Sequence, residues 1–246
     1  MSRIELLAVE GLPEINPGDD LAALIAAAAA QPLGAEDLLV VAHKIVSKAE
    51  GSVVELAAIE PSPRAIEIAE RQGRDPRQVE VILSQSAEII RDSGHLLICR
   101  THHGLICANA GIDGSNSGAA GRLILLPRDP DASARALRAA LPGHPAVLIT
   151  DSFGRAWRRG QLDVAIGLAG MTPLDDWRGR EDSEGRPLRG TLLAVADQAA
   201  AAADLARTKD GACPAVIVRG LGRLISEDDG PGAQALLRPA AEDRFL

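Results

Sequence analysis

Short apolar runs that end on polar residues constrain the fold of this chain more than any other sequence feature. The runs Asp37–Ala42, Ala146–Thr150 and Pro214–Arg219 have the length of buried strands, and helical patterns lie between them. Strands that alternate with helices predict the α/β class, here a mixed α+β arrangement with mixed sheets and flanking helices. No linker, repeat or low-complexity tract interrupts the chain, so we interpret residues 1–246 as one domain, with two intertwined subdomains as the alternative.

Other segments have recognisable periodicity. Arg64–Gln72 and Pro76–Ile90 are predicted to form two helices separated by Gly73. His95–Arg100 and Leu105–Asn109 are predicted to be paired strands, with His102 and His103 in the turn between them. Adjacent residues of an extended chain point to opposite faces, so these two histidines make a poor metal chelate and are interpreted as turn residues.

Composition argues against nucleic acid and membrane as partners. The net charge is -8 and there are no Tyr, two Phe and two Trp residues, so a basic footprint and a base-stacking surface are both missing. The apolar run Leu21–Ala30 is about half the length needed to cross a bilayer. Cys99, Cys107 and Cys213 lack metal-site spacing and an even count, so we expect reduced thiols and a cytoplasmic location.

Polar and charged residues follow the apolar run 146–150 directly. Asp151 and Ser152 come at the strand end, where ligands of open α/β sheets gather, and Arg155, Arg158 and Arg159 follow within eight residues of Asp151. These residues predict a metal or phosphate site. The alternative is an Asx turn beside a solvated arginine rim.

A second acidic residue lies in the loop 109–118, which is rich in glycine, serine and asparagine. Asp113, together with Asp151 and a hydroxyl, supplies the hard oxygen ligands that Mg²⁺ prefers. The structural alternative is a glycine-rich connection with Asp113 in a tight turn. Lys48, after the run 37–42, is a candidate phosphate contact, and the alternative for it is a solvated surface lysine.

The long polar segment Asp175–Gly190 has two interpretations. Its arginines are able to form an anion site, or they pair with the acidic residues of the same segment. Neither a Walker A loop nor a G-x-G-x-x-G turn that opens a helix is present in the sequence. A nucleotide would therefore be held by an unorthodox site.

Five motifs in one order resemble those of the coenzyme F-420-0:L-glutamate ligase family, the gamma-glutamyl ligases of deazaflavin biosynthesis. They are Gly11-Leu12-Pro13, Val46-Ser47-Lys48-Ala49-Glu50-Gly51, Asn109-Ala110-Gly111-Ile112-Asp113-x-Ser115-Asn116, Thr150-Asp151-Ser152-x-Gly154-Arg155-x-x-Arg158-Arg159-Gly160 and Pro214-Ala215-Val216-x-Val218-Arg219-Gly220. The resemblance runs from the N-terminus to about Leu221 and favours the functional interpretations of Asp113 and Asp151 over the structural ones.

The resemblance implies a GTP-dependent ligase that joins L-glutamate to the lactyl carboxylate of coenzyme F-420-0 and adds further gamma-linked glutamates in many members. It also implies a two-part subunit, a homodimer, and the use of magnesium or manganese with potassium. Matched by position, Asp113, Asp151 and Ser152 are metal ligands, Asp113, Asp151 and Lys48 are catalytic, and Arg155, Arg158 and Arg159 are candidates to hold substrate carboxylates. The positions matched to GTP contacts are Leu12, Pro13, Glu14, Ile15, His43, Lys44, Lys48, Asn116, Ala206, Arg207, Thr208, Lys209, Asp210, Gly211, Ala212 and Cys213.

Two departures from the family pattern lie on the nucleotide side. The segment 206–213 lacks the glycine- and glutamate-rich form of archaeal members, and His43-Lys44 replaces small hydroxyl residues of some members. Two alternatives therefore stay open, namely a related amino-acid ligase with a different phosphorylated acceptor and a non-catalytic nucleotide- or metal-binding scaffold.

Overall fold

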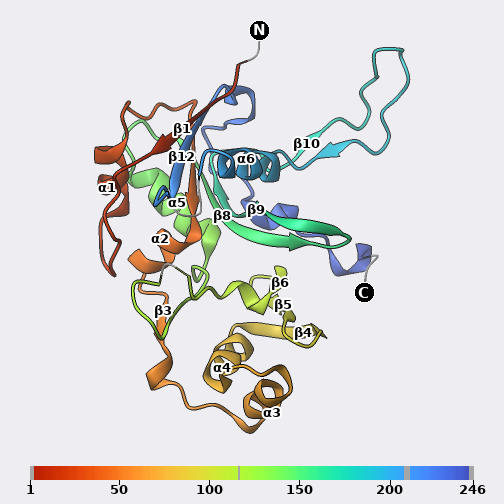
Figure 1. The fold of residues 1–246 in the computed structure, drawn as a ribbon. Coiled ribbons are helices and arrows are strands. Elements are labelled where there is room, and N and C mark those ends of the chain that lie inside the picture. Colours follow the sequence, from red (N-terminus) through yellow and green to blue (C-terminus); the bar gives the residue numbers. More distant parts are fainter. Residues whose placement is uncertain (1–2, 116, 208–210, 244–246) are drawn as a thin grey trace.

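The computed structural model describes residues 3–115, 117–207 and 211–243 and has the predicted α/β architecture (Figure 1). In chain order the elements are β1 (Glu5–Val9), α1 (Leu21–Ala28), β2 (Leu38–Ala42), α2 (His43–Ala49), β3 (Val53–Glu55), α3 (Pro63–Gln72), α4 (Pro76–Ser84), β4 (Ser86–Asp92), β5 (Leu97–Thr101), β6 (Ile106–Ala108), β7 (Arg122–Ile124), α5 (Pro130–Ala140), β8 (Ala146–Arg155), β9 (Arg158–Ala169), β10 (Asp175–Asp176), β11 (Leu192–Leu193), α6 (Val195–Asp204) and β12 (Ala215–Arg219).

A five-stranded mixed sheet in the order β1-β12-β2-β8-β9 forms the main body. Only β2 and β8 run parallel, and the other three pairings are antiparallel. The first strand and the last strand of the chain therefore lie side by side, with Val9 opposite Ala215. The three apolar runs of the sequence are the three inner strands of this sheet, β12, β2 and β8.

Both faces of the sheet are buried, which explains why its inner strands are apolar without alternation. In β2, Leu39 and Val41 pack into one core with α1 and α5, whereas Leu38 and Val40 pack into a second core with α6. Figure 1 shows α1 and α5 on one side of the sheet and α6 on the other. Successive strand residues point to opposite faces, so each inner strand contributes to both cores.

The antiparallel sheet β4-β5-β6 forms a second part with α3 and α4, around its own apolar cluster. The predicted pairing of the segments 95–100 and 105–109 is confirmed by β5 and β6, and Gly73 ends α3 in the left-handed conformation. The predicted helix Pro76–Ile90 is wrong at its C-terminal end, because α4 stops at Ser84 and residues 86–92 form β4. Pairing with β5 supplies the backbone partners there, and tertiary context overrides the helical pattern.

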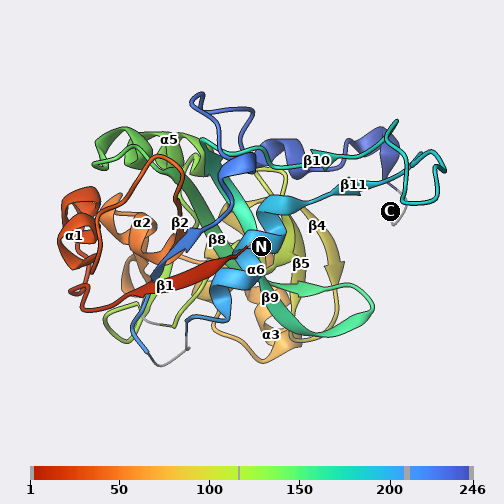
Figure 2. The same cartoon turned by 90° about the horizontal axis from the view of Figure 1, so that it is seen from above.

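Two segments project from the body in both views (Figures 1 and 2). One is the end of the β8–β9 hairpin, where Trp157 is 89% exposed and has a positive φ. The other is an arm that leaves the body at β10 and returns at β11. Within this arm Arg178 pairs with Asp176 and Arg186 pairs with Glu184, which confirms pairing with the segment's own acids for these two arginines.

The C-terminal segment is fastened to α5 by buried polar side chains. Asp131 accepts hydrogen bonds from the backbone N–H groups of Leu168 and Ala233, and Arg138 donates to Asp229 and to the carbonyl of Ser226. None of the helices in residues 3–115, 117–207 and 211–243 has the length and apolar character required to span a bilayer.

Candidate functional site

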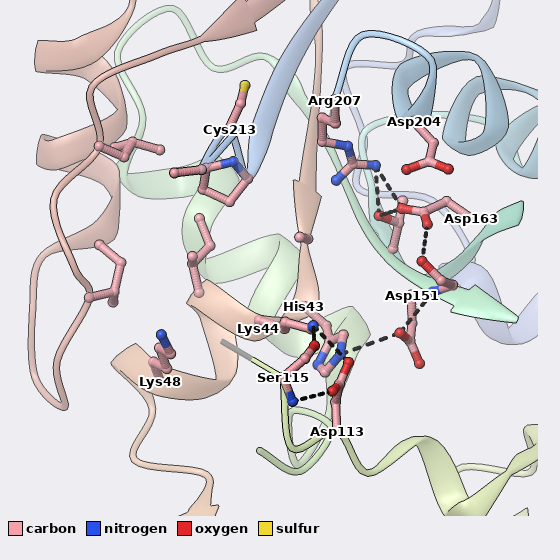
Figure 3. A pocket seen from close by; sticks show the side chains of 18 of the residues that line it. His43, Lys44, Lys48, Asp113, Ser115, Asp151, Asp163, Asp204, Arg207 and Cys213 are labelled. Carbon is pink, nitrogen blue, oxygen red and sulfur yellow. Dashed lines mark hydrogen bonds and ion pairs between the residues drawn. The ribbon is translucent and has the colours of Figure 1, made fainter. Parts of the chain in front are cut away.

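A polar cleft of about 700 Å³ lies at the C-terminal end of β2 and beside the middle of β8, which continues to Arg155. The parallel register places Ala42 beside Thr150, so that His43 and Asp151, the next residue of each chain segment, meet at the same level. Figure 3 shows that side chains from the start of α2, the middle of β8, β9 and the loop after β6 point into this cleft. The predicted position at the ends of two strands is confirmed for β2 and wrong for β8, because pairing with β9 continues that strand through Asp151 and Ser152 to Arg155.

Asp151 enters the cleft opposite the first residue of α2. The His43 Nε2 atom lies 3.4 Å from the Asp151 Oδ1 atom, and the imidazole is 1% exposed. The other ring nitrogen of His43, Nδ1, lies 3.3 Å from the Ser47 Oγ atom one helical turn later. The sequence predicts no helix directly after the run 37–42, whereas the structure has one from His43 to Ala49.

Asp113 is placed by a tight turn that follows β6. Asn109, Ala110 and Gly111 all have positive φ, and a Cβ on Gly111 would lie 2.8 Å from a methyl carbon of Leu126, so only glycine fits there. The Asn109 side chain accepts a hydrogen bond from Arg74, which stabilises this left-handed turn. Asp113 then pairs with Ile124 through two backbone hydrogen bonds, so its carboxylate is firmly directed toward the cleft.

Lys44 holds the Asp113 carboxylate in this position. The Lys44 Nζ atom lies 2.7 Å from the Asp113 Oδ2 atom and also donates to the Ser115 hydroxyl, while the Ser115 N–H donates to Asp113 Oδ1. Burial raises the pKa of Asp113, but the hydrogen bonds from Lys44 and Ser115 outweigh it and hold the pKa below its ordinary value. Asp113 is therefore an anion at neutral pH.

Lys48 lies one turn further along α2 and is buried, with an ion pair to Glu14. Glu14 belongs to the segment Leu12–Ile15, which lines the cleft together with Lys48. The alternative of a solvated surface lysine is wrong for Lys48, because only 9% of its side chain is exposed.

A third carboxylate, Asp163 on β9, forms a buried network behind Asp151. Its Oδ1 atom accepts a hydrogen bond of 2.6 Å from the Ser152 hydroxyl, and its Oδ2 atom accepts from Thr150 and from Arg207 at 2.7 Å each. The Asp163 and Arg207 side chains are 5% and 7% exposed. Arg207 follows α6, so this ion pair connects the segment after α6 to the central sheet.

The charges of the cleft are unbalanced. Among the residues that the structure describes, five carboxylates and three lysine or arginine side chains line it; these are Glu14, Asp113, Asp151, Asp163, Asp204, Lys44, Lys48 and Arg207. The excess of carboxylates and the hydroxyls of Ser115 and Ser152 form a donor set of hard oxygens, which suits Mg²⁺ or Mn²⁺. Among the residues that the structure describes, no group of three His, Cys, Asp or Glu side chains is close enough to hold a metal by itself. Two carboxylates assisted by a hydroxyl, water and substrate oxygens therefore fit this cleft better than a closed all-protein metal site.

The structure brings most of the predicted site residues together. The cleft is lined by Leu12, Pro13, Glu14, Ile15, His43, Lys44, Lys48, Asp113, Asp151, Ser152, Arg207, Ala212 and Cys213. Ala206 instead packs against the core beneath α6, and Gly211 is not a lining residue. Asn116, Thr208, Lys209 and Asp210 lie outside the described residues.

The three arginines of the β8–β9 hairpin are not among the residues that line the cleft. Arg155, Arg158 and Arg159 are exposed near the hairpin tip, where Arg155 donates to the Arg159 carbonyl. Gln161 on the same hairpin does line the cleft, so this hairpin extends outward from the site. A role for the arginines in binding substrate carboxylates stays a prediction.

Sequence analysis missed Gln161, Asp163 and Asp204 as cleft residues. Asp163 had one available signal, since it is a single acid next to the apolar run Val164–Ala169, and buried acids are rare unless they are paired. Asp204 is the last residue of α6, and nothing in its local sequence separates it from an ordinary surface acid. His102 and His103 lie in the β5–β6 turn, as predicted, and contact backbone carbonyls.

Ionic side chains at the end of β2 and in the middle of its parallel neighbour β8 define the class of this chain, an α/β protein with a cleft lined by charged groups. Comparison with known families identifies the particular family. Residues 11–220 match the family model described as F420-0:Gamma-glutamyl ligase, and the chain belongs to this family. Membership makes it an enzyme of the ligase class, one that forms an amide bond.

Curated relatives agree over almost the whole chain. The protein is 47% identical to a coenzyme F420:L-glutamate ligase of Methanothermobacter thermautotrophicus, with 98% of each chain covered. It is 44% identical to the protein of the same name from Methanopyrus kandleri, with 100% of each chain covered. For the Archaeoglobus fulgidus ligase of that name the identity is 45%, over 89% of this chain and 88% of the relative.

Proposed function

We propose that this protein joins L-glutamate to the lactyl carboxylate of coenzyme F420-0 with GTP as the energy source, and that it adds further gamma-linked glutamates. The names of the relatives support the two substrates. The observation that carries the proposal is the convergence of Asp113 and Asp151 on one cleft, together with the buried Lys48. A reaction on polyanions needs positive charge in the cleft. The lysines supply it directly, and the acids supply it by binding a metal cation.

The proposed reaction has two steps. An oxygen of the lactyl carboxylate attacks the terminal phosphorus of GTP, which gives an acyl phosphate and GDP. The amine of glutamate then attacks the acyl carbon, a proton leaves the nitrogen, and inorganic phosphate departs as the amide forms. The first step is needed because a free carboxylate is a poor acceptor for an amine in water.

Each group of residues has a separate role in this proposal. Asp113 and Asp151, with the Ser152 hydroxyl, hold Mg²⁺ or Mn²⁺, and the metal supplies charge neutralisation for the transferred phosphoryl group. Lys48 leaves Glu14 and contacts the phosphate chain, and the segment Leu12–Ile15 forms the neighbouring wall of the nucleotide site. Potassium is a further expected cation, to which we assign no residues.

A homodimer is also part of the proposal. The arm between β10 and β11 extends away from the body, and its arginines and acids pair mainly within the arm (Figure 2). Such an extension buries little surface in a single chain, and a second copy would give it a packing partner. Sedimentation velocity of the protein, compared with a variant that has the segment 178–190 replaced by a short glycine-containing turn, tests this; a wild-type monomer contradicts it.

A related ligase with a different phosphorylated acceptor is the second candidate. The observation in its favour is that His43 and Lys44, which replace small hydroxyl residues of some family members, contact Asp151 and Asp113 directly. These substitutions change the cleft where nucleotide and metal are expected. A non-catalytic scaffold is the third candidate, and mutual repulsion among unused cleft carboxylates argues against it.

Mass spectrometry tests the proposal directly. The protein is incubated with coenzyme F420-0, L-glutamate, Mn²⁺ and either GTP, ATP or no nucleotide. We expect mass increases of one or more glutamyl units with GTP alone, and the number of units gives the chain length. A folded protein that makes no product but releases GDP in the presence of another phosphorylated acid would support the second candidate, and absence of any GDP release would support the scaffold.

Variants of the two acids test the site. Asp113→Asn and Asp151→Asn each remove one charge from the cleft and are expected to lower turnover at least about a hundredfold, as losses of transition-state charge stabilisation do. Asp129→Asn, at the exposed N-cap of α5, removes an equal charge away from the cleft and serves as the matched control. Near-normal turnover in both cleft variants would refute the metal assignment, and unchanged GTP affinity in Lys48→Ala would refute the phosphate contact.

A further inference from the structure

We propose that Asp163 is a positioning residue for the ligase reaction, which sets the direction of the Ser152 hydroxyl and anchors Arg207. This inference rests on the proposed metal site at Asp113, Asp151 and Ser152. It assigns a role to a buried acid that neither the sequence motifs nor the proposed reaction uses.

The hydrogen-bond pattern around Asp163 gives the first argument. An ionised carboxylate only accepts hydrogen bonds, so the Ser152 and Thr150 hydroxyls must both direct their single hydrogen atoms toward it. The Ser152 oxygen therefore acts only as an acceptor toward the cleft. A hydroxyl that ligates a cation needs this orientation, because a hydrogen atom that pointed at the cation would repel it.

The second argument is that both carboxylate oxygens of Asp163 already accept hydrogen bonds from protein partners. Ser152 donates to its Oδ1 atom, Thr150 and Arg207 donate to its Oδ2 atom, and the residue is 4% exposed. Arg207 also neutralises the charge that the carboxylate would otherwise add to the cleft. Asp163 is thus placed to orient a ligand residue and is poorly placed to be a ligand itself.

The third argument concerns the segment that Arg207 begins. Ala212 and Cys213 line the same cleft, a few residues after the ion pair between Arg207 and Asp163. One carboxylate on β9 therefore connects the proposed metal ligand Ser152 with the start of the proposed nucleotide segment. A buried ion pair contributes little net stability compared with apolar packing, so stability alone does not account for this arrangement.

The test is a double-mutant cycle on metal affinity in the absence of substrates. Binding of Mn²⁺ alone is measured by electron paramagnetic resonance of the free ion for wild type, Asp163→Asn, Ser152→Ala and the double variant. We expect Asp163→Asn to weaken Mn²⁺ binding about tenfold, the lower end of the range for residues that orient metal ligands. In the Ser152→Ala background the same change should lower the Mn²⁺ affinity by less than about twofold, because the hydroxyl that Asp163 orients is missing.

Two further variants make the result decisive. Thr150→Val removes a buried hydroxyl bond to the same carboxylate but keeps the Ser152 bond, so its Mn²⁺ affinity should stay within about threefold of wild type. Asp163→Glu keeps the charge and an acceptor, and it replaces Asp163→Asn in both backgrounds if circular dichroism shows that the latter does not fold.

Equal losses of affinity in the two backgrounds would overturn the proposal, since Asp163 would then act through charge or folding alone. Asp151→Asn separates this result from a failure of the metal site itself. If Asp151→Asn binds Mn²⁺ as tightly as wild type, the proposed metal site is wrong, and the role of Asp163 at that site is overturned with it.

Discussion

Replacement of Asp131 by alanine should destabilise the protein strongly, because this carboxylate fastens the C-terminal segment to the body. Asp131 lies in the first turn of α5 and is 6% exposed. Its Oδ1 atom accepts hydrogen bonds of 2.8 Å from the backbone N–H groups of Leu168, on β9, and Ala233, in the C-terminal segment. Asp131→Ala leaves both of these buried donors without their acceptor.

The magnitude follows from these two bonds. A hydrogen bond to a charged group contributes about 1.5–3 kcal/mol, so the loss of two predicts a decrease of about 3–6 kcal/mol in the free energy of unfolding. For a chain of this length each kcal/mol lowers the Tm by about 2–4 °C, which gives a decrease of about 6–24 °C. Asp131→Asn keeps one acceptor oxygen and should lose less.

Asp129→Ala is the matched control, since Asp129 is the exposed N-cap of the same helix and accepts one hydrogen bond from the Ala132 N–H. Loss of this cap predicts a decrease of about 1 kcal/mol in the free energy of unfolding. Both variants remove one negative charge from the same helix end, so their difference isolates the buried bonds. Urea unfolding followed by circular dichroism measures it, and an Asp131→Ala variant no less stable than Asp129→Ala would refute the reasoning.

Three more predictions concern cations, protons and thiols. Lys44→Gln removes the ammonium group that lies 2.7 Å from Asp113, so Mn²⁺ affinity measured by calorimetry should increase about threefold or more, and a decrease would contradict competition between Lys44 and the metal. Burial raises the pKa of Asp197 in the folded state, so the folded protein holds this proton more tightly than the unfolded chain does. The free energy of unfolding therefore falls as the pH rises from about 3.9 through that raised pKa. Asp197→Asn should therefore be more stable than wild type at pH 7 but not at pH 3, which urea unfolding at both pH values checks. Burial, and then the charge of Asp151, raise the pKa of Cys107 to about 12, so iodoacetamide at pH 8 should modify the partly exposed Cys213 well before Cys107, as peptide mass spectrometry will show.

The three inner strands of the main sheet were predictable because burial on both faces gives them continuous apolar runs. Leu38–Ala42 and Ala146–Thr150 show this pattern directly. The strand β4 was not predictable, because its apolar residues continue the helical spacing of α4 and its strand state depends on β5, which follows later in the chain. The helix α2 has seven residues and no side-chain N-cap, so it too lacked a local signal.

The residues of the site also divide into those that the sequence predicts and those that it does not. Asp151 was identified because it follows an apolar run, and Asp113 because it lies in a loop rich in small and oxygen-bearing residues; the family resemblance favoured the functional interpretation of both. Asp163 was missed because its significance depends on Arg207, which lies 44 residues later and reaches it only in the folded chain. Pairs of this kind leave almost no trace in a local sequence pattern. The roles of the cleft residues in metal and nucleotide binding stay predictions.

The position of the last strand has a consequence for folding during synthesis. β12 lies between β1 and β2, so β1 has no partner strand in the sheet until Ala215–Arg219 have left the ribosome. At about 5–20 residues per second, the chain between β1 and β12 takes roughly 10–40 s to make. During that interval the apolar strand β2 has an open edge that is able to pair with other chains. A nascent chain arrested before β12 should therefore be captured by holdase chaperones and cleaved by proteases, whereas a chain that has released β12 is able to close its sheet.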